Sequence, residues 1–153
     1  MIDFSHMEQY RENNRLEAKK AVGGLPNSMW ETYSAFANTL GGLILLGVEE
    51  YPDHSLHPVD LPDPAAILQD FWSAVNNSDF VSANILRDED VWIEEIDGKH
   101  IVVINVPVAK PEDRPVYVYG DRENGIFLRS GEGDYRVPRE IYGLYFGNPA
   151  ASY

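Results

Sequence analysis

Residues 35–50 read Ala-Phe-Ala-Asn-Thr-Leu-Gly-Gly-Leu-Ile-Leu-Leu-Gly-Val-Glu-Glu, and the centre of the predicted fold follows from this stretch. Its first residues belong to a helix that opens with a capping box at residues 28–31, Ser-Met-Trp-Glu, and runs to about Thr39. Two consecutive glycines then end the helix, as is common at a helix C-terminus. The unbroken apolar run that follows is typical of a central strand buried on both faces, and two glutamates end it abruptly.

The rest of the chain predicts an α+β domain around this strand. Residues 15–19 alternate apolar and charged side chains, which favours a short half-buried strand before the helix. An Asp-Pro pair at residues 63–64 opens a second helix. We expect two β-hairpins, over residues 91–106 and 116–129, and a closing helix at 138–145. The order β-α-β-α, then hairpins and a C-terminal helix, predicts a mixed sheet with two or three helices.

The length and composition of the chain exclude several classes of protein. Its 153 residues, 44% of them hydrophobic, make one globular domain of ordinary size. The absence of cysteine excludes disulfides, zinc–thiolate sites and a catalytic thiol. Because no apolar run approaches the roughly 18 residues of a membrane span, and the N-terminus does not resemble a signal peptide, we expect a cytoplasmic protein with no membrane contact.

The charges are unevenly distributed along the chain. It has 25 acids against 12 Lys and Arg, a net charge of −13, so on average it repels phosphate. Most bases lie near the ends: residues 1–25 and 110–139 are charge-balanced, whereas residues 26–86 contain acids and no Lys or Arg. If the two ends meet in the fold, one face is locally positive. The alternative, which charge alone favours, is an interspersed, solvated surface.

Four glutamates are candidate metal ligands. Glu12 and Glu17 flank the first predicted strand, and Glu49 and Glu50 end the buried one, so pairing of the two strands would bring carboxylates together. Clustered carboxylates bind hard divalent cations such as Mg²⁺ and Mn²⁺, and such an ion activates water for attack on phosphate esters. In a chain with 25 acids, the ordinary alternative is a solvated acidic surface.

Other catalytic and binding motifs give little support. The chain has no Walker-type phosphate loop and no serine in a Gly-x-Ser-x-Gly elbow. Arg129 precedes a glycine-rich turn at residues 130–133 whose amides could form an anion nest, although a flexible turn with an exposed arginine is the plainer interpretation. His54 and His57 lie in a proline-rich segment that we interpret as a solvated loop.

Taken in order, these segments resemble a known family. Residues 35–50 match its signature, an Ala-Phe-Ala-Asn-Thr-x-Gly-Gly turn followed by an apolar strand and Gly-Val-acid, and residues 16–19 are similar to its opening Glu-Phe-Lys strand. Its later strands are matched by residues 102–107, 114–117 and 127–131. The family is the Schlafen-type AlbA-like domain, and the resemblance covers about residues 8–145 of the single domain that we expect over residues 1–153.

The resemblance implies a nucleic-acid-binding domain, of the kind found as the N-terminal part of bacterial transcriptional regulators, and our leading interpretation is that it is not an enzyme. The expected partner is therefore DNA or RNA, no cofactor is expected, and the chain either stands alone or begins a longer regulator. The bases expected to contact phosphates are drawn from the two charge-balanced ends: Lys19, Lys20, Arg114, Arg129 and Arg136.

An enzymatic alternative also follows from the resemblance, because the related core of animal Schlafens is an endoribonuclease that uses two Glu, one Asp and a divalent metal. Glu12 and Glu17 match the five-residue spacing of the paired glutamates, and the third acid falls at Glu49 or Glu50. We assign Glu12, Glu17 and Glu49 as catalytic ligands of Mg²⁺ or Mn²⁺ under this alternative. The sequence departs from the family at the third acid, which is not Asp, and at Ala18, which replaces Phe.

A third alternative is a protein-interaction module without nucleic acid. Residues 26–86, which lack any Lys or Arg, would then form an acidic face for a basic partner or the surface of a homodimer. Under this alternative the bases should be scattered, each paired with a neighbouring acid.

The signature also has a structural logic of its own. Asn38 at the helix end can satisfy free carbonyl groups, and Gly41 and Gly42 allow the chain to turn directly into the buried strand. Together with Gly47, these residues are expected to determine the fold whatever the activity.

Overall fold

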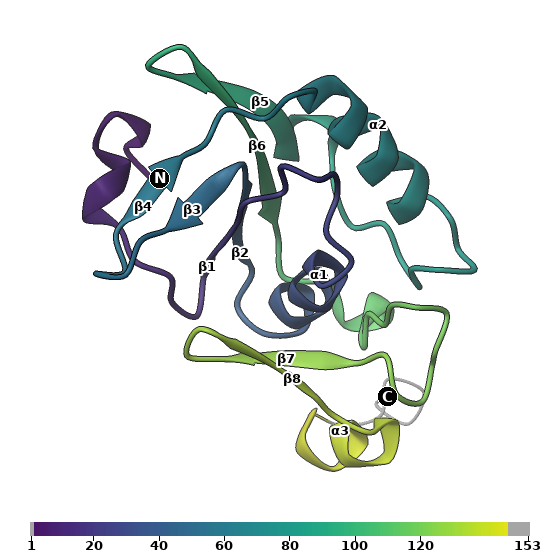
Figure 1. Ribbon diagram of the computed structural model, residues 1–153. Helices are drawn as coiled ribbons and strands as arrows, with labels where there is room; N and C mark the ends of the chain where they lie inside the picture. The colour runs from purple at the N-terminus through teal and green to yellow at the C-terminus, as the bar shows by residue number, and fades with distance from the viewer. Residues whose placement is uncertain (1, 147–153) are drawn as a thin grey trace.

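The computed structural model describes residues 2–146 and has a four-stranded mixed sheet at its centre (Figure 1). The strand order is β1 (Leu16–Lys19), β2 (Gly42–Leu46), β6 (Lys99–Val106) and β5 (Val91–Ile96). β1 runs parallel to β2, and β6 runs antiparallel to both of its neighbours. The predicted α+β class and mixed sheet are therefore confirmed.

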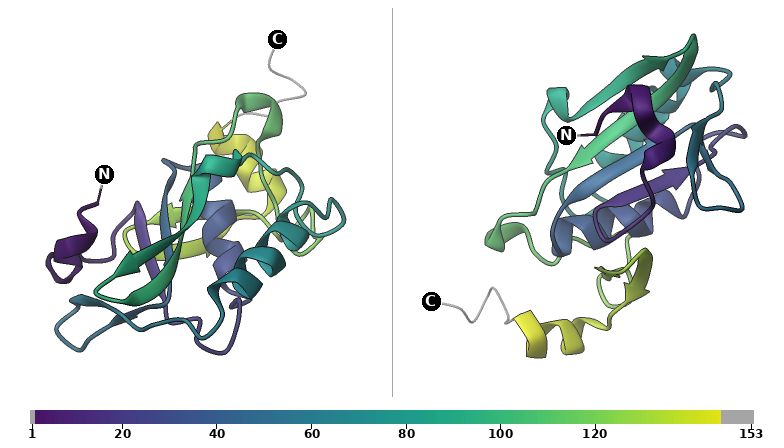
Figure 2. Two further views of the ribbon diagram at one scale, coloured as in Figure 1. Left: turned by 90° about the horizontal axis from the view of Figure 1, so that it is seen from above. Right: turned by 90° about the vertical axis from the view of Figure 1, so that its left-hand side faces the viewer.

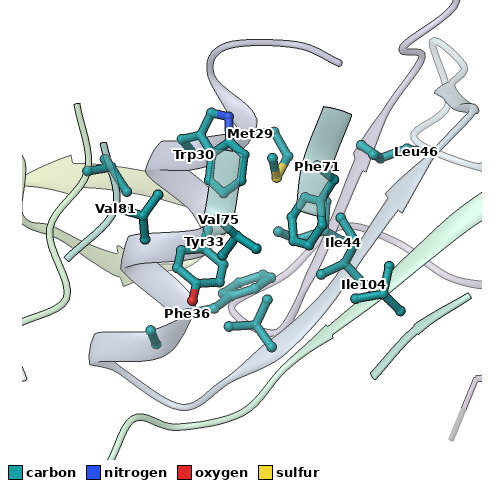
Figure 3. Packing of buried hydrophobic residues seen from close by; sticks show 14 of the residues in the cluster. Met29, Trp30, Tyr33, Phe36, Ile44, Leu46, Phe71, Val75, Val81 and Ile104 are labelled. Carbon is teal, nitrogen blue, oxygen red and sulfur yellow. The ribbon is translucent and has the colours of Figure 1, made fainter. Parts of the chain in front are cut away.

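One face of the sheet is covered by two helices, α1 (Met29–Asn38) and α2 (Pro64–Val75). Ile44 on β2 points toward this side, where the rings of Trp30 and Phe71 stack with centroids 5.2 Å apart (Figure 3). This layer is the main core. α2 buries one apolar face in it, whereas α1 is buried almost all round.

The opposite face of the sheet is covered near the N-terminus. Leu45, the neighbour of Ile44 on β2, points to this side because side chains alternate along a strand. It packs in a second apolar cluster with η1 (Phe4–Gln9) and with the hairpin of β3 (Val48–Glu50) and β4 (Leu56–Pro58) (Figure 2). The central strand is thus buried on both faces, as its unbroken apolar run predicts.

A second hairpin lies beneath α1, formed by β7 (Phe127–Ser130) and β8 (Gly133–Arg136), and leads into α3 (Arg139–Phe146) (Figure 1). Thr32 on α1 donates to Asp134 on this hairpin at 2.6 Å. Two short helical turns complete the described elements: η2 (Asp88–Asp90) and η3 (Pro111–Asp113). Within residues 2–146, no helix is long and apolar enough to cross a membrane.

The predicted capping box at the start of α1 is wrong. Ser28 already has helical backbone angles, and its side chain makes no capping hydrogen bond. The backbone explains why: the N–H groups of Met29, Trp30 and Glu31 donate to carbonyls three residues earlier, so the helix entrance needs no side-chain acceptor. The second predicted cap is confirmed, because Asp63 accepts a hydrogen bond from the N–H of Ala66.

The predicted hairpin over residues 116–129 is also largely wrong, since only one bridge, between Tyr117 and Ile126, joins these segments. The side chain of Asn38 forms hydrogen bonds with both backbone groups of Val116. It accepts from the N–H at 2.8 Å and donates to the C=O at 2.9 Å. These groups are then unavailable to a strand partner, and β7 pairs with β8 instead. The carbonyls that Asn38 satisfies belong to other segments, not to its own helix end.

The turn from α1 into β2 depends on two adjacent glycines for different reasons. Gly41 has φ +72°, a left-handed conformation, and a Cβ there would also lie 2.8 Å from the carbonyl oxygen of Val106. Gly42 belongs to β2, and a Cβ there would lie 2.7 Å from the carbonyl oxygen of Arg15. Gly47, at the end of β2, again has positive φ, +94°.

Candidate functional site

A buried arginine joins the N-terminal segment to the β7–β8 hairpin. The side chain of Arg129 is 0% exposed, and its Nη1 donates to Glu17 and to Asp134, each at 2.8 Å. Its Nη2 and Nε donate to the carbonyl of Asn13 at 2.9 and 3.2 Å, and its guanidinium lies 5.0 Å from the ring centroid of Phe36. These contacts fix the hairpin against the start of β1.

Arg129 is among the bases expected to contact phosphates, and the structure places its side chain in the interior. Both carboxylates and two main-chain carbonyls, those of Asn13 and Leu16, already accept hydrogen bonds from its guanidinium. A buried arginine with these partners is a structural cation, because withdrawing it would leave two acids unpaired. The two charge-balanced ends of the chain do meet, but through a buried ion pair.

Glu12 lies beside Glu17, as the metal-site hypothesis requires, but the pKa of its carboxyl group is raised. Its side chain is half-buried, and one carboxylate oxygen accepts from the N–H of Ala18 at 2.9 Å. Burial raises the pKa of Glu12 to about 8, helped by a hydrogen bond to Glu17 and by the negative charges of Glu17 and Glu50, although the N–H of Ala18 opposes the shift. Glu12 therefore keeps its proton to a higher pH than an ordinary glutamate does.

Three carboxylates converge at the edge of β1, but they are not the predicted set. Oxygens of Glu12, Glu50 and Glu132 all lie within 4.8 Å of one another. These residues come from the segment before β1, the end of β3 and the turn between β7 and β8. An all-carboxylate set of this size suits a hard divalent cation.

The other two predicted ligands, Glu17 and Glu49, are not members of this trio. Glu49 neighbours Glu50 on β3, so its side chain points to the opposite side of the strand. Glu17 is buried and paired with Arg129. The sequence leaves open whether Glu49 or Glu50 is the third acid. By geometry, Glu50 is the one that lies beside Glu12. Glu132 was missed; the only signal for it was an acid in the glycine-rich turn.

Most of the bases have no acid partner. All Lys and Arg residues lie within residues 2–146, and of these only Arg87 and Arg129 have a carboxylate within 4.0 Å. Lys20 and Arg136 are exposed, and Lys19 and Arg114 are partly exposed. Arg87 makes exposed pairs with Glu89 and a contact with Asp90. This pattern differs from the scattered, paired bases expected for a module that binds no nucleic acid.

The unpaired bases come from different elements of the fold. Lys19 ends β1, where it pairs with Leu46, and Lys20 follows it, whereas Arg129 contacts Leu16 at the start of that strand. Arg136 ends β8.

The fold and this site define an α+β domain in which a buried arginine ties a C-terminal hairpin to the first strand of a mixed sheet. The sequence model described as Schlafen, AlbA_2 matches residues 12–138 of the chain. The protein therefore belongs to the Schlafen AlbA_2 family, as the resemblance implied.

Two solved structures are similar to this chain. The first is the solution structure of the N-terminal domain of a Nitrosomonas europaea protein named as related to the ATP-dependent DNA helicase RecG. It has 28% sequence identity and a TM-score of 0.65, covering 90% of this chain and 94% of that one. The second is the crystal structure of the DIP2311 protein from Corynebacterium diphtheriae, with 18% identity, a TM-score of 0.52, and coverage of 86% of this chain and 26% of that one. No curated protein matches the chain.

Proposed function

We propose that this chain is a non-enzymatic nucleic-acid-binding domain of the transcriptional-regulator type. Membership of the Schlafen AlbA_2 family supports the proposal, as does the similarity to a domain from a protein named as helicase-related. The observation that carries it is the set of unpaired bases. In a chain with more than twice as many acids as bases, Lys19, Lys20, Arg114 and Arg136 have no carboxylate within ion-pair distance.

The proposed phosphate contacts are these four bases, without Arg129. An exposed lysine or arginine that neutralises a phosphate releases condensed counterions, and this release favours binding at low salt. The net charge of −13 opposes binding elsewhere on the surface, so contacts should be confined to the neighbourhood of the bases.

The test is a fluorescence-anisotropy titration of labelled 20-nucleotide RNA and 20-base-pair DNA at several salt concentrations. With four phosphate contacts, we expect log K to fall against log salt with a slope of about −3 to −4 on duplex DNA. Replacing Lys19 and Lys20 with Gln should reduce that slope by about 2. The matched control is Arg87→Gln. Because Arg87 is already paired with acids, this substitution should leave the slope unchanged. Absence of binding to either nucleic acid at about 10 µM protein in low salt would exclude the proposal.

A second candidate function is a metal-dependent nuclease, and one observation favours it: the convergence of Glu12, Glu50 and Glu132. These carboxylates would hold Mg²⁺ or Mn²⁺, and such an ion would supply an activated water beside a bound phosphate. Within this candidate, Glu50 and Glu132 replace Glu49 and Glu17 as proposed ligands.

Calorimetric titration with Mn²⁺ separates this candidate from the first. We expect saturable binding that Glu132→Gln weakens at least tenfold, while the control Glu49→Gln binds as the parent does. Cleavage of structured RNA should then require Mn²⁺ and be lost in the same variant. Equal Mn²⁺ affinity in both variants would show that the trio is not a metal site, whatever the outcome of the nucleic-acid titration.

A further inference from the structure

The sheet ends on one side at β5, and this strand has a free edge. Among the described residues 2–146, β5 pairs only with β6, through six residues on each strand. The two strands form a hairpin closed by a two-residue turn, in which Asp97 and Gly98 have φ +51° and +79° (Figure 1). The outer edge of this hairpin is therefore a candidate site for strand addition.

The hydrogen bonds of His100 show which groups of β5 face outward. His100 pairs with Glu95, yet its N–H donates to the carboxylate of Asp60 at 2.8 Å and its C=O accepts from the N–H of Leu61 at 3.0 Å. Both backbone groups of His100 thus point away from β5, which makes this a non-hydrogen-bonded pair, and the groups of Glu95 point away from β6.

Hydrogen-bonded and non-hydrogen-bonded pairs alternate along an antiparallel ladder, so the backbone groups of Ile93, two residues before Glu95, also point away from β6. Within residues 2–146, the N–H and C=O groups of Ile93 and Glu95 have no other hydrogen-bond partner. Both residues are exposed, and Ile93 is an apolar side chain with 39% of its surface accessible. The edge thus offers two donors and two acceptors at the spacing that an added strand requires.

Several of the usual protections of an edge strand are absent from β5, and the charged residues that remain are acids. It has six residues in a regular register, without a proline, a lysine or a bulge. Its charges are all of one sign: residues 88–97 contain six acids and no Lys or Arg. Arg87 offsets Glu89 and Asp90, but the carboxylates of Glu94 and Glu95 have no Lys or Arg partner.

We propose that the free edge of β5 accepts an extended segment of a partner protein in which Lys or Arg alternates with apolar residues. Backbone pairing to Ile93 and Glu95 would supply affinity, and the acids along the strand would select a basic sequence. A second copy of this chain fits poorly, because it would bring its own six acids to the same seam.

The test uses two fluorescent, end-blocked heptapeptides, Lys-Val-Lys-Val-Lys-Val-Lys and its counterpart with Glu in place of Lys. The basic peptide should bind at least about tenfold tighter than the acidic one. Ile93→Pro removes an outward N–H without touching a bond to β6, and should weaken binding about tenfold or more. The matched control Ile93→Val keeps the N–H and a β-branched side chain, and should bind within about twofold of the parent.

Amide hydrogen exchange provides a readout that needs no variant. The basic peptide should slow exchange at Ile93 and Glu95 at least about tenfold, whereas Trp92 and Glu94, already bonded to β6, should change little. Unchanged exchange at Ile93 and Glu95, or equal binding by the proline and valine variants, would show that the peptide is held only by the general negative charge. A dimer that Ile93→Pro abolishes would assign the edge to a second copy and overturn the proposal.

This inference stands apart from the proposed nucleic-acid function. Ile93→Pro should leave the DNA and RNA titrations unchanged, because β5 carries none of the four proposed phosphate contacts. Loss of peptide binding with intact nucleic-acid binding, or the reverse, identifies which of the two proposals has failed.

Discussion

The two edges of the central sheet differ in whether their outward-facing backbone groups have hydrogen-bond partners. At β1 the edge is closed: the guanidinium of Arg129 donates to the carbonyls of Asn13 and Leu16 and pairs with Glu17. At β5, the groups of Ile93 that face outward have no partner within residues 2–146. The chain therefore covers the β1 edge with a long-range contact from its own C-terminal hairpin. It leaves the β5 edge available to a different molecule.

The largest effect is expected from opening the closed edge. Arg129→Ala leaves the buried carboxylate of Glu17 and the partly buried carboxylate of Asp134 without a cation, and breaking a buried pair in this way typically costs about 3–5 kcal/mol of unfolding free energy. Urea denaturation followed by circular dichroism measures this directly. The control Arg136→Ala removes an exposed arginine from the same hairpin and should cost less than about 0.5 kcal/mol. Similar losses in the two variants would mean that Arg129 does not hold the edge closed.

The next effect concerns how closely β2 approaches β1 and α1. Gly42→Val places a side chain against the carbonyl oxygen of Arg15 and the ring of Phe36, whose nearest atoms lie 2.7 and 2.8 Å from the added Cβ. Overpacking of this kind costs about 1–3 kcal/mol, and the carbonyl belongs to the backbone and cannot rotate away.

Thermal denaturation of Gly42→Val should be compared with Gly23→Val. A Cβ at Gly23 meets nothing within 4 Å, and this glycine has no positive φ. We expect Gly42→Val to melt several degrees lower than Gly23→Val. Equal melting temperatures would show that β1 can move away from β2 at little cost.

A smaller effect, with a defined pH dependence, is expected at the carboxylates beside the closed edge. The folded protein raises the pKa of Glu12 from 4.5 to about 8, mainly by burial. Between these values the folded state keeps a proton that the unfolded state has lost, so Glu12 makes stability fall as pH rises through this window.

Glu12→Gln should remove that dependence. In buffer with a chelator, the variant should be more stable than the parent at pH 8, by about 1 kcal/mol once the half-exposed carboxyl is discounted for solvent screening, and similar to it at pH 4. Denaturant titrations at the two pH values make the comparison. A variant less stable than the parent at pH 8 would show that ionised Glu12 has a favourable partner.

The sequence predicted what depends on local pattern. The apolar run of β2, the cap at Asp63 and the two-residue turn of the β5–β6 hairpin each follow from residues close together in the chain. Arg129 could not be placed in this way, because its partner Glu17 is 112 residues distant and nothing in either segment distinguishes a buried arginine from an exposed one. Its role follows only from the packed structure.

The candidate site was predicted in part for the same reason. Glu12 and Glu50 lie near strands whose pairing could be inferred, so their proximity was within reach of the sequence. Glu132 comes from the β7–β8 hairpin, whereas the sequence pattern predicts that β7 pairs with residues 116–119. The competing partner was Asn38, whose side chain occupies the backbone groups of Val116.

The smallest expected effect tests whether the edge at β5 is open in the free protein. Glu94 and Ile93 are neighbours, but the ladder assigns the N–H of Glu94 to the carbonyl of Ile101 and leaves that of Ile93 unpaired. Glu94→Pro removes the ladder bond and leaves the carbonyl of Ile101, a fully buried residue, unsatisfied, at a cost of about 1–3 kcal/mol. The unfolding free energy of Ile93→Pro should lie within about 0.5 kcal/mol of that of Ile93→Ala, because the N–H that proline removes makes no hydrogen bond. Urea titrations of the three variants decide the matter: a proline at 93 as costly as one at 94 would mean that the outward N–H of Ile93 already has a partner, and that both edges of the sheet are closed.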